Sequence, residues 1–311
     1  MAAMENRIYT GEEREGYYVQ PMRKRIWAVQ LDILKKVDTV CKCHGINYYG
    51  WYGTLLGAIR HKGFIPWDDD IDLAMLRDDY EQFRCHIKQA LPKGWEVSEH
   101  EPTMISIFNS DTVHLDQDFL DRFHGCPFKI GIDIFCLDRI PCNKAEEELQ
   151  LNLFWAVYCL CIHWNLPDED EQWTEQNKWN YLKEIETLTG YHFNLQHPVK
   201  EQLYFLADRI AAMYWDTESD EVANIAELYS SPHCRVPKKY FSRSLTVPFE
   251  HTMLPVLEDY DLLCRIEYGD NYMIPIQEPS HNYLKKQMEY LRKLFEKAGK
   301  PLPEEFNMTF N

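Results

Sequence analysis

The sequence predicts an α+β fold, in which a mixed sheet with flanking helices is followed by a mostly helical region packed on it. Up to about residue 140, short segments with strand periodicity alternate with amphipathic helical segments. From residue 144 to 215 the pattern is helical, with no internal repeat or low-complexity linker. We therefore expect an N-terminal extension (residues 1–20), a core (21–140) and a mostly helical region (141–311) that completes the ligand site.

Periodicity and turn residues define the first elements of this core. We expect helices over residues 26–41, 54–60 and from 77 onward, and strands over 46–52 and 70–75. Apolar residues recur at three- and four-residue steps from Ile26 to Cys41, which is typical of an amphipathic helix. Asp78 and Asp79 begin the third helix, because acidic side chains are favourable at its positive end.

The same signals predict the later elements. We expect strands over residues 95–100, 104–110, 128–138 and 242–250, and late helices over 258–268 and 280–298. The segment 128–138, "FKIGIDIFCLD", is the strongest strand signal in the chain. The helical stretch between residues 144 and 215 should be interrupted near Pro167 and Pro198, because proline does not continue a helix.

Composition excludes several classes of protein. The 50 acidic residues exceed the 33 Lys and Arg and give a net charge of −17, so no nucleic-acid partner is expected. The N-terminus resembles neither a signal peptide nor an anchor, and the apolar stretch 153–162 is too short for a membrane span, which needs roughly 20 residues. We therefore expect no integral membrane segment and a cytoplasmic location, where the ten cysteines are free thiols rather than zinc ligands.

Four aspartates crowd into five positions at Asp68, Asp69, Asp70 and Asp72. A solvated acidic loop is the ordinary explanation, but Asp70 and Asp72 would project from the same face of a strand, about 7 Å apart. Two such carboxylates suit Mg²⁺, which binds carboxylates together with substrate phosphates. An EF-hand is excluded, because the positions that require Gly and Glu hold Leu73 and Asp79.

A third carboxylate and a Gly-Thr pair complete the pattern. Asp133 lies between two isoleucines on the predicted strand, where a buried acid needs a partner or a metal. Asp138 is expected to be a turn residue at the end of that strand, with support of the metal site as the alternative. Gly53 and Thr54 precede a helix whose backbone N–H groups can bind phosphate. Together these features follow the pattern of the nucleotidyltransferase fold, in which two metals bridge the phosphates of a nucleotide.

The string "GTLLGAIRHKGFIPWDDDIDLAMLRDDYEQF" closely resembles the LicD family, the bacterial phosphocholine transferases related to fukutin-type ribitol-phosphate transferases. Two later blocks agree with it, "GIDIFCLDRIP" and "FEHTMLPVLEDYDLLCRIEYGDNYMIP". The resemblance runs from about residue 26 to 275. One departure is Cys136, where the family often has a proline. The resemblance implies a nucleotidyltransferase-like fold and transfer of an alcohol phosphate from a CDP-alcohol to a glycan.

Individual residues take their expected roles from this resemblance. Asp70, Asp72 and Asp133 match the catalytic metal-binding carboxylates, which would hold Mg²⁺ or Mn²⁺, with two ions expected. The matching substrate-binding positions are Gly53 and Thr54 in the phosphate-binding turn and Arg60, His61 and Lys62 in the basic part of the motif. A solvated helix end is the alternative for the three basic residues. Trp67 and Asp69 are further expected substrate-binding residues. The general base is Asp133, Asp69 or absent, and the sequence leaves these alternatives open.

The expected reaction is transfer of phosphocholine from CDP-choline to a hydroxyl of a cell-surface glycan or its precursor, such as a lipopolysaccharide or teichoic acid, with release of CMP. A lipid-linked acceptor would be met at the inner face of the membrane, where so acidic a chain needs a local basic patch. Choline needs an aromatic cage. The candidates are Tyr48, Tyr49, Trp51, Tyr52 and Trp67, for which core packing is the alternative. By the resemblance alone, residues 267–272 and His281 would close over the donor.

Two other functions stay open. A true nucleotidyltransferase would use the same metals to move NMP from an NTP, and would release pyrophosphate instead of CMP. A non-catalytic binding module on a transferase fold would be marked by loss of the metal carboxylates. Because all three carboxylates are present, the sequence favours an enzyme.

Overall fold

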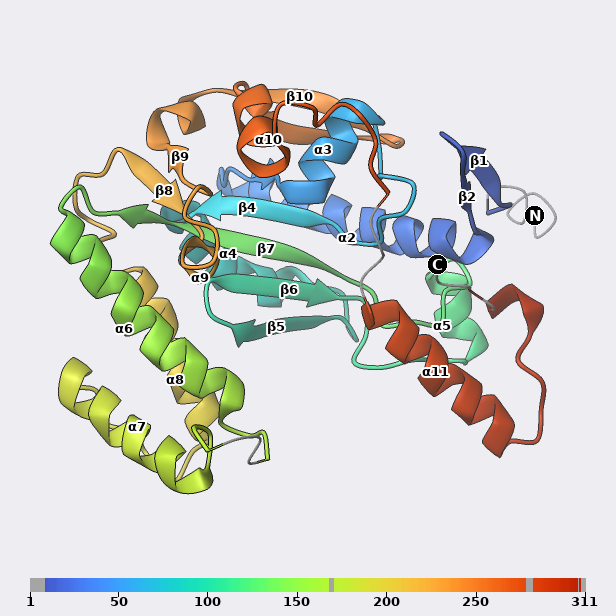
Figure 1. Ribbon diagram of the computed structural model, residues 1–311. Coiled ribbons are helices and arrows are strands. Elements are labelled where there is room, and N and C mark those ends of the chain that lie inside the picture. Colours follow the sequence, from blue (N-terminus) through green and yellow to red (C-terminus); the bar gives the residue numbers. More distant parts are fainter. Residues whose placement is uncertain (1–8, 168–170, 278–281, 307, 309–311) are drawn as a thin grey trace.

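A central mixed sheet organises the computed structural model, which describes residues 9–167, 171–277, 282–306 and 308 (Figure 1). Its main strands lie in the order β3 (Tyr49–Gly50), β4 (Asp72–Leu76), β7 (Gly131–Ile140), β6 (Met104–Phe108) and β5 (Glu96–Glu101). Two short strands, β8 (Glu221–Ala223) and β9 (Val236–Pro237), extend the sheet from the far end of β7. The predicted α+β class is confirmed.

β4 and β7 are parallel neighbours, and the other pairs in this sheet are antiparallel. The register places Asp72 of β4 directly beside Asp133 of β7, and Ser106 of β6 beside Asp133 on the other side. Because neighbouring residues in register share a face of the sheet, three polar side chains form a row across three strands.

Three helices pack against the sheet where the sequence predicts them, although some boundaries differ: α2 (Pro21–His44), α3 (Tyr52–Arg60) and α4 (Arg77–Ala90). A short helix that was not predicted, α5 (Gln117–Arg122), lies between β6 and β7 in the chain. Helix α2 begins with Pro21 and is capped after His44 by Gly45, whose left-handed conformation (φ 68°) suits glycine. The predicted strand 46–52 is shorter than expected, because α3 already begins at Tyr52, and Asp70 precedes β4 instead of lying in it.

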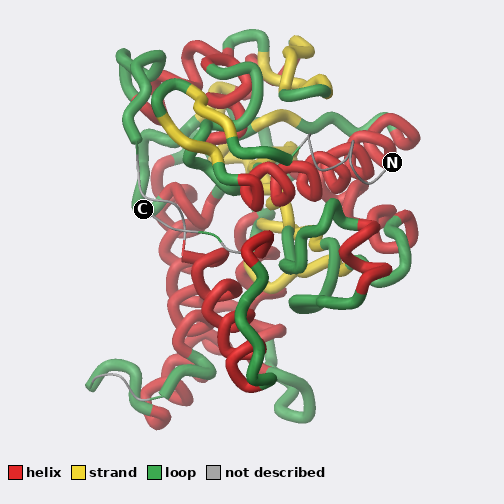
Figure 2. The backbone as a smooth tube through the Cα atoms, turned by 90° about the vertical axis from the view of Figure 1, so that its right-hand side faces the viewer, coloured by secondary structure: helices red, strands yellow, loops and turns green. Residues whose placement is uncertain are grey.

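A helical arm with its own apolar core follows the first part of the sheet. It consists of α6 (Lys144–His163), α7 (Glu175–Thr189) and α8 (Val199–Ala211), so the predicted helical run and its two breaks are confirmed. Fully buried Phe154, Leu160 and Leu203 belong to an apolar cluster separate from that of the sheet. Figure 1 labels these three helices below the strands, and Figure 2 shows from the side that helices extend below the sheet.

The chain then returns to the sheet and completes its core. It does so through α9 (Ile225–Leu228), η1 (Lys238–Ser242), the hairpin of β10 (Ser244–Phe249) and β11 (Thr252–Leu257), α10 (Tyr260–Tyr268), α11 (Asn282–Lys297) and η2 (Glu304–Phe306). Phe249, Leu254 and Val256 are fully buried in the same apolar cluster as β4 and β7. Residues beyond 220 therefore build part of the sheet domain as well as its rim.

The N-terminal residues form a small hairpin, β1 (Glu12–Arg14) and β2 (Tyr17–Val19), which is tied to the body by ion pairs. Arg14 binds Glu250 before β11, with its Nη1 2.6 Å from Oε1. Among the described residues, none of the helices combines the length and apolar character that crossing a bilayer requires.

Candidate active site

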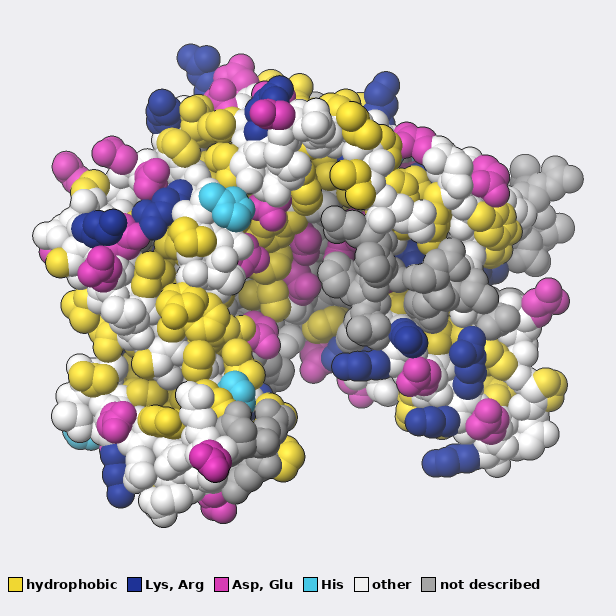
Figure 3. Space-filling model, in the orientation of Figure 1, with side chains coloured by type: hydrophobic (Ala, Val, Ile, Leu, Met, Phe, Trp, Pro, Cys, Tyr) yellow, Lys and Arg dark blue, Asp and Glu magenta, His cyan; other side chains and the backbone are white. Residues whose placement is uncertain are grey.

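A cavity of about 1140 Å³ opens where β4 and β7 begin. It lies between this edge of the sheet, α3, α9 and α10, and Figure 3 shows acidic side chains inside the corresponding hollow. Among the described residues, its wall contains one cation, Arg60, and seven acids: Asp68, Asp69, Asp70, Asp72, Asp133, Glu227 and Glu267. Such an excess of negative charge favours binding of cations.

Two of these carboxylates belong to the row on the sheet. Asp72 and Asp133 lie side by side in register, while Ile134 and Leu73 next to them are fully buried. Ser106 donates a hydrogen bond of 2.5 Å from its Oγ to Oδ1 of Asp133 and so fixes that carboxylate. Burial raises the pKa of Asp133 despite this bond, and the Asp70 carboxylate adds to the rise.

The loop before β4 brings three more carboxylates together. One oxygen from each of Asp68, Asp69 and Asp70 lies within 4.8 Å of the others. Burial raises the pKa of Asp68 well above its ordinary value, and repulsion and a hydrogen bond from Asp70 act in the same direction. Sequence reasoning did not assign Asp68 to the site, although its position next to Asp69 and Asp70 was a signal.

Helix α2 holds the carbonyl groups of this loop. Arg23 is 1% exposed and donates from Nη1 to the Asp68 carbonyl (2.8 Å), and Trp27 donates to the same oxygen (3.1 Å). Gln30 donates from Nε2 to the carbonyl of Asp69 (2.8 Å) and that of Gly131 (3.3 Å). Sequence reasoning missed these residues; the available signal was Arg23 and Gln30 on the otherwise apolar stripe of an amphipathic helix.

Asp69 differs from its neighbours because a buried arginine approaches it. Arg23 Nη1 lies 3.8 Å from Asp69 Oδ2, and only 8% of Asp69 is exposed. This contact partly compensates the charge of Asp69. The geometry thus favours a positioning role for Asp69 over that of a general base.

The first turn of α3 faces the aspartates. Its first intrahelical bond runs from Leu55 N to Trp51 O, so the N–H groups of residues 52–54 precede the helical ladder. A Cβ on Gly53 would lie 2.5 Å from Asp68 Oδ2, so a side chain there would displace that carboxylate. Thr54 does not line the cavity; its Oγ1 accepts a hydrogen bond from Asp72 N (2.8 Å) and fixes the start of β4.

The three basic residues of the motif, at the end of α3, differ in whether they line the cavity. Arg60 lines the cavity and donates from Nη1 to the carbonyl of Tyr272 (2.8 Å). His61 and Lys62 lie outside the cavity wall: His61 pairs with Glu15 (3.0 Å), and Lys62 is exposed. The structure therefore brings only Arg60 of this set to the aspartates.

A second acidic wall, which sequence reasoning missed, faces the aspartates across the cavity. Tyr52 has a left-handed backbone (φ 39°), and its hydroxyl donates to Glu227 of α9. Burial raises the pKa of Glu227, against the effect of this bond. Cys234 Sγ lies 3.4 Å from Glu267 Oε2. Burial and nearby carboxylates, Glu267 first, raise the pKa of Tyr268 and keep its phenol neutral.

The aromatic residues considered for a choline cage lie in two different environments. Tyr48, Tyr49 and Trp51 are buried in the core and do not line the cavity, whereas Tyr52 and Trp67 do. The segment 267–272 contributes four wall residues, Glu267, Tyr268, Asn271 and Tyr272. His281 lies outside the described residues.

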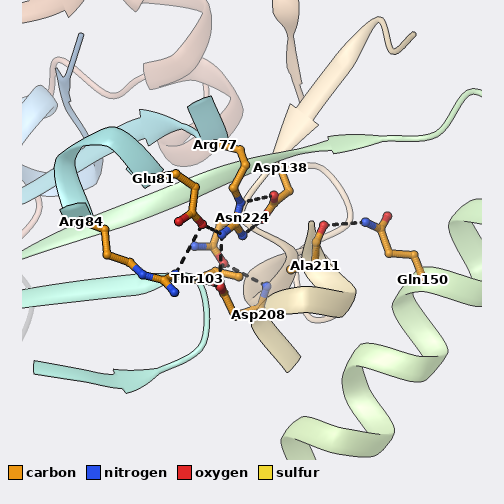
Figure 4. A network of polar contacts seen from close by, with 10 residues as sticks. Arg77, Glu81, Arg84, Thr103, Asp138, Gln150, Asp208, Ala211 and Asn224 are labelled. Atoms are coloured by element: carbon orange, nitrogen blue, oxygen red, sulfur yellow. Dashed lines mark hydrogen bonds and ion pairs between the residues drawn. The ribbon is translucent and has the colours of Figure 1, made fainter. Parts of the chain in front are cut away.

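Asp138 corrects a prediction. It is a fully buried residue within β7 and not a turn residue at the strand's end, and it forms two 2.7 Å hydrogen bonds with Arg77 (Figure 4). The strand continues through Asp138 because β8 pairs with it there, with Ala223 in register.

The carboxylate set fits a divalent metal. It provides only hard oxygen donors, it is clustered within a cavity, and no described lysine or arginine besides Arg60 lines the wall. A mixed sheet that presents carboxylates from two neighbouring strands beside the first turn of a helix defines a domain of the nucleotidyltransferase type.

Comparisons with known proteins agree with this class. The model of a family described as "LicD/FKTN/FKRP, nucleotidyltransferase domain" matches residues 45–131, which include the aspartate cluster and end just before Asp133. The "Lipopolysaccharide cholinephosphotransferase LicD" of Haemophilus influenzae is 26% identical over 258 residues, 80% of this chain and 91% of that protein. The chain is therefore similar to LicD proteins along most of its length, and the resemblance predicted from the sequence is confirmed.

Two shorter matches are uncharacterized proteins. RP689 of Rickettsia prowazekii is 38% identical over 70 residues, 21% of this chain and 25% of that protein. RT0683 of Rickettsia typhi is 38% identical over 69 residues, 22% of each chain. These matches add no information about activity.

Proposed function

We propose that the protein is a metal-dependent transferase that moves phosphocholine from CDP-choline to a hydroxyl of a glycan, with release of CMP. The observation that carries this proposal is the cavity with two acidic walls, one at the start of β4 and β7 and one on α9 and α10. The first wall suits metals and a diphosphate, and the second suits a cationic group. The Haemophilus influenzae relative, a lipopolysaccharide cholinephosphotransferase by name, supports a glycan acceptor.

Asp70, Asp72 and Asp133 would hold one or two Mg²⁺ or Mn²⁺ ions, with Asp68 next to Asp70 as a further oxygen donor. When bound, such ions neutralise a diphosphate and stabilise the leaving CMP. Ser106 keeps the Asp133 carboxylate in place, and Thr54 fixes the backbone at Asp72. The protein's part is to position these charges before the donor arrives.

The donor's diphosphate is proposed to lie between the aspartates and the first turn of α3. There the N–H groups of residues 52–54 can donate to phosphate oxygens. Arg60 supplies the only positive side chain of the described wall, and burial lowers its pKa. His61 and Lys62, which are placed elsewhere, have no part in this contact.

The second wall favours a cationic alcohol over a neutral polyol. Tyr52 and Tyr268 present phenol rings beside Glu227 and Glu267, a combination that holds a quaternary ammonium by cation–π and charge attraction. Trp67 lines the same cavity near the aspartates. Ribitol would leave these two carboxylates uncompensated.

Thermal unfolding in the presence of candidate donors tests the proposal. We would compare CDP-choline, CDP-ethanolamine, CDP-ribitol, CTP and ATP with Mg²⁺, with Mn²⁺ and with EDTA. CDP-choline at about a hundred times its Kd should stabilise the fold by about 2.7 kcal/mol, only with metal. Asp72→Asn should abolish this stabilisation, and CMP should be the product of turnover.

The nucleotidyltransferase alternative makes a different prediction in the same experiment. Stabilisation by CTP or ATP, with pyrophosphate release and no response to CDP-alcohols, would replace the proposed reaction. Absence of any shift would support a non-catalytic binding module. A cytoplasmic location at the inner face of the membrane is part of the proposal, because a lipid-linked glycan precursor would be met there.

A further inference from the structure

The C-terminal helix α11 has a charge opposite to that of the rest of the chain. Residues 282–300 contain six Lys and Arg and two Glu, whereas the whole chain has 33 Lys and Arg against 50 acids. Figure 3 shows these basic side chains gathered over α11, on the face of the molecule where the cavity opens. A basic patch of this kind is unexpected on so acidic a protein.

One side of α11 anchors it firmly to the sheet domain. Leu284, Met288 and Leu291 follow at i, i+4 and i+7 and are at most 2% exposed. Gln287 forms two hydrogen bonds with the backbone of Lys129: its Oε1 accepts from Lys129 N (2.9 Å), and its Nε2 donates to Lys129 O (2.8 Å). The outward side is therefore held in a fixed orientation.

The outward side carries a stripe of three lysines and a tyrosine. Lys286, Tyr290, Lys293 and Lys297 follow at i, i+4, i+7 and i+11, so they project from one face, and all are exposed. None of the three lysines forms an ion pair within the described part of the chain. Lysines with an amphipathic aromatic residue between them are typical of helices that lie on a membrane surface.

The cavity opens beside this helix through apolar side chains. Leu284 at the start of α11 lines the cavity, as do Ile274 and Ile276, which are 62% and 71% exposed. An apolar rim of this kind suits a substrate whose anchor remains in a lipid phase while its head enters the cavity.

We infer that the lysine stripe of α11 docks the protein on an anionic phospholipid bilayer and turns the cavity toward that surface. Each lysine near such a surface contributes about 1 kcal/mol of attraction, or roughly fivefold in affinity. The rest of the chain is strongly acidic and is repelled, which fixes the orientation. The inference rests on the proposed function for its purpose, a lipid-linked acceptor, but the docking itself does not.

Cosedimentation with vesicles tests the inference without donor or metal. The full chain should bind vesicles that contain phosphatidylglycerol, should not bind pure phosphatidylcholine, and should dissociate at about 0.5 M salt because screening removes the attraction. Changing Lys286, Lys293 and Lys297 together to Glu should weaken binding about 100-fold or more. The matched control changes the exposed Lys35, Lys144 and Lys183 to Glu and should bind within threefold of the natural chain.

Three results would overturn the inference: equal binding by the two triple variants, equal binding to both kinds of vesicle, or binding to soluble heparin without binding to vesicles. Circular dichroism and thermal unfolding show whether both variants are folded. Transfer to a water-soluble acceptor should be equal in the two variants, and transfer to a vesicle-embedded acceptor should fall in the α11 variant. Loss of the donor-dependent thermal shift would contradict the proposed function and leave docking intact.

Discussion

Charged residues lie at both ends of the stretch along which β4 and β7 pair, Asp72 and Asp133 at its start and Arg77 and Asp138 directly after its last pair. The two ends differ in how the charge is compensated. At the start of the strands, Asp72 and Asp133 lie side by side, and a serine hydroxyl is the side chain that binds Asp133. Five residues further on, Arg77 and Asp138 form a bidentate ion pair and are 3% and 0% exposed. The two carboxylates of the first pair repel each other, and the arginine and aspartate of the second pair attract each other.

The paired end belongs to the structural framework. Arg77 also binds Glu81 (2.9 Å) and Asp208 of α8 (3.0 Å), and Arg84 shares both of these acids (Figure 4). The network joins the sheet to the helical arm. The repelling end faces the cavity instead, where both of its carboxylates line the wall. Carboxylates gathered in a cavity, with raised pKa values at Asp68 and Asp133, mark a candidate functional site.

Removing a carboxylate from the repelling end should affect activity most. We expect Asp72→Asn to lower phosphocholine transfer about a thousandfold or more, because metal-assisted charge stabilisation contributes several kcal/mol. Without metal, the free energy of unfolding should stay equal or rise, because the repulsion between Asp72 and Asp133 disappears.

Urea unfolding in EDTA measures the stability, and CMP release measures the activity. Asp118→Asn, an exposed change on α5, is the control and should alter neither. A strong loss of metal-free stability in Asp72→Asn would contradict this prediction.

Removing the arginine of the ion pair should have the opposite effect, a loss of stability of the fold. We expect Arg77→Met to lower the free energy of unfolding by about 3–5 kcal/mol, because Asp138 becomes an uncompensated buried charge. Arg84→Met is the matched control; its side chain is 29% exposed, and its loss should cost less than about 1 kcal/mol. Urea unfolding measures both. The double change Arg77→Met/Asp138→Leu should recover much of the loss, and failure to recover it would show that packing and not charge dominates.

The secondary structure and the carboxylates Asp72 and Asp133 were easier to predict from the sequence than the buried ion pair of Arg77 and Asp138. Periodicity places β4, β7 and α4, and alternation correctly separates Asp133 from the buried isoleucines beside it. The ion pair of Asp138 depends on the register between distant strands and on α8, which a local pattern does not contain. The same holds for Glu227 and Glu267, because α9 and α10 reach the cavity only through tertiary packing.

Support of the aspartate loop by α2 should be measurable as a smaller effect. We expect Gln30→Leu to lower the free energy of unfolding by about 1–3 kcal/mol, because the buried carbonyls of Asp69 and Gly131 lose a donor. Metal affinity should fall about 10- to 100-fold, since the loop orients the ligands. Calorimetric titration with Mn²⁺ and urea unfolding test both effects. The control, Gln176→Leu, changes an exposed glutamine on α7. Unchanged metal affinity in Gln30→Leu would show that the loop keeps its shape without this contact.

The smallest expected effect concerns Glu227. Its hydrogen-bond partner is a neutral tyrosine hydroxyl, whereas the partner of Asp138 is a charged arginine. Burial raises its pKa, so between the ordinary glutamate pKa and this raised value the folded chain binds more protons than the unfolded chain. The free energy of unfolding should therefore fall as pH rises through that window. Glu227→Gln cannot titrate, so it should match the natural chain at low pH and unfold a few degrees higher at neutral pH. Exposed Glu201→Gln should follow the natural chain at every pH.

If Glu227 also attracts the cation of the donor, Glu227→Gln should lower the affinity for CDP-choline and leave the affinity for CDP-ribitol unchanged. An equal loss for both donors would restrict Glu227 to holding Tyr52.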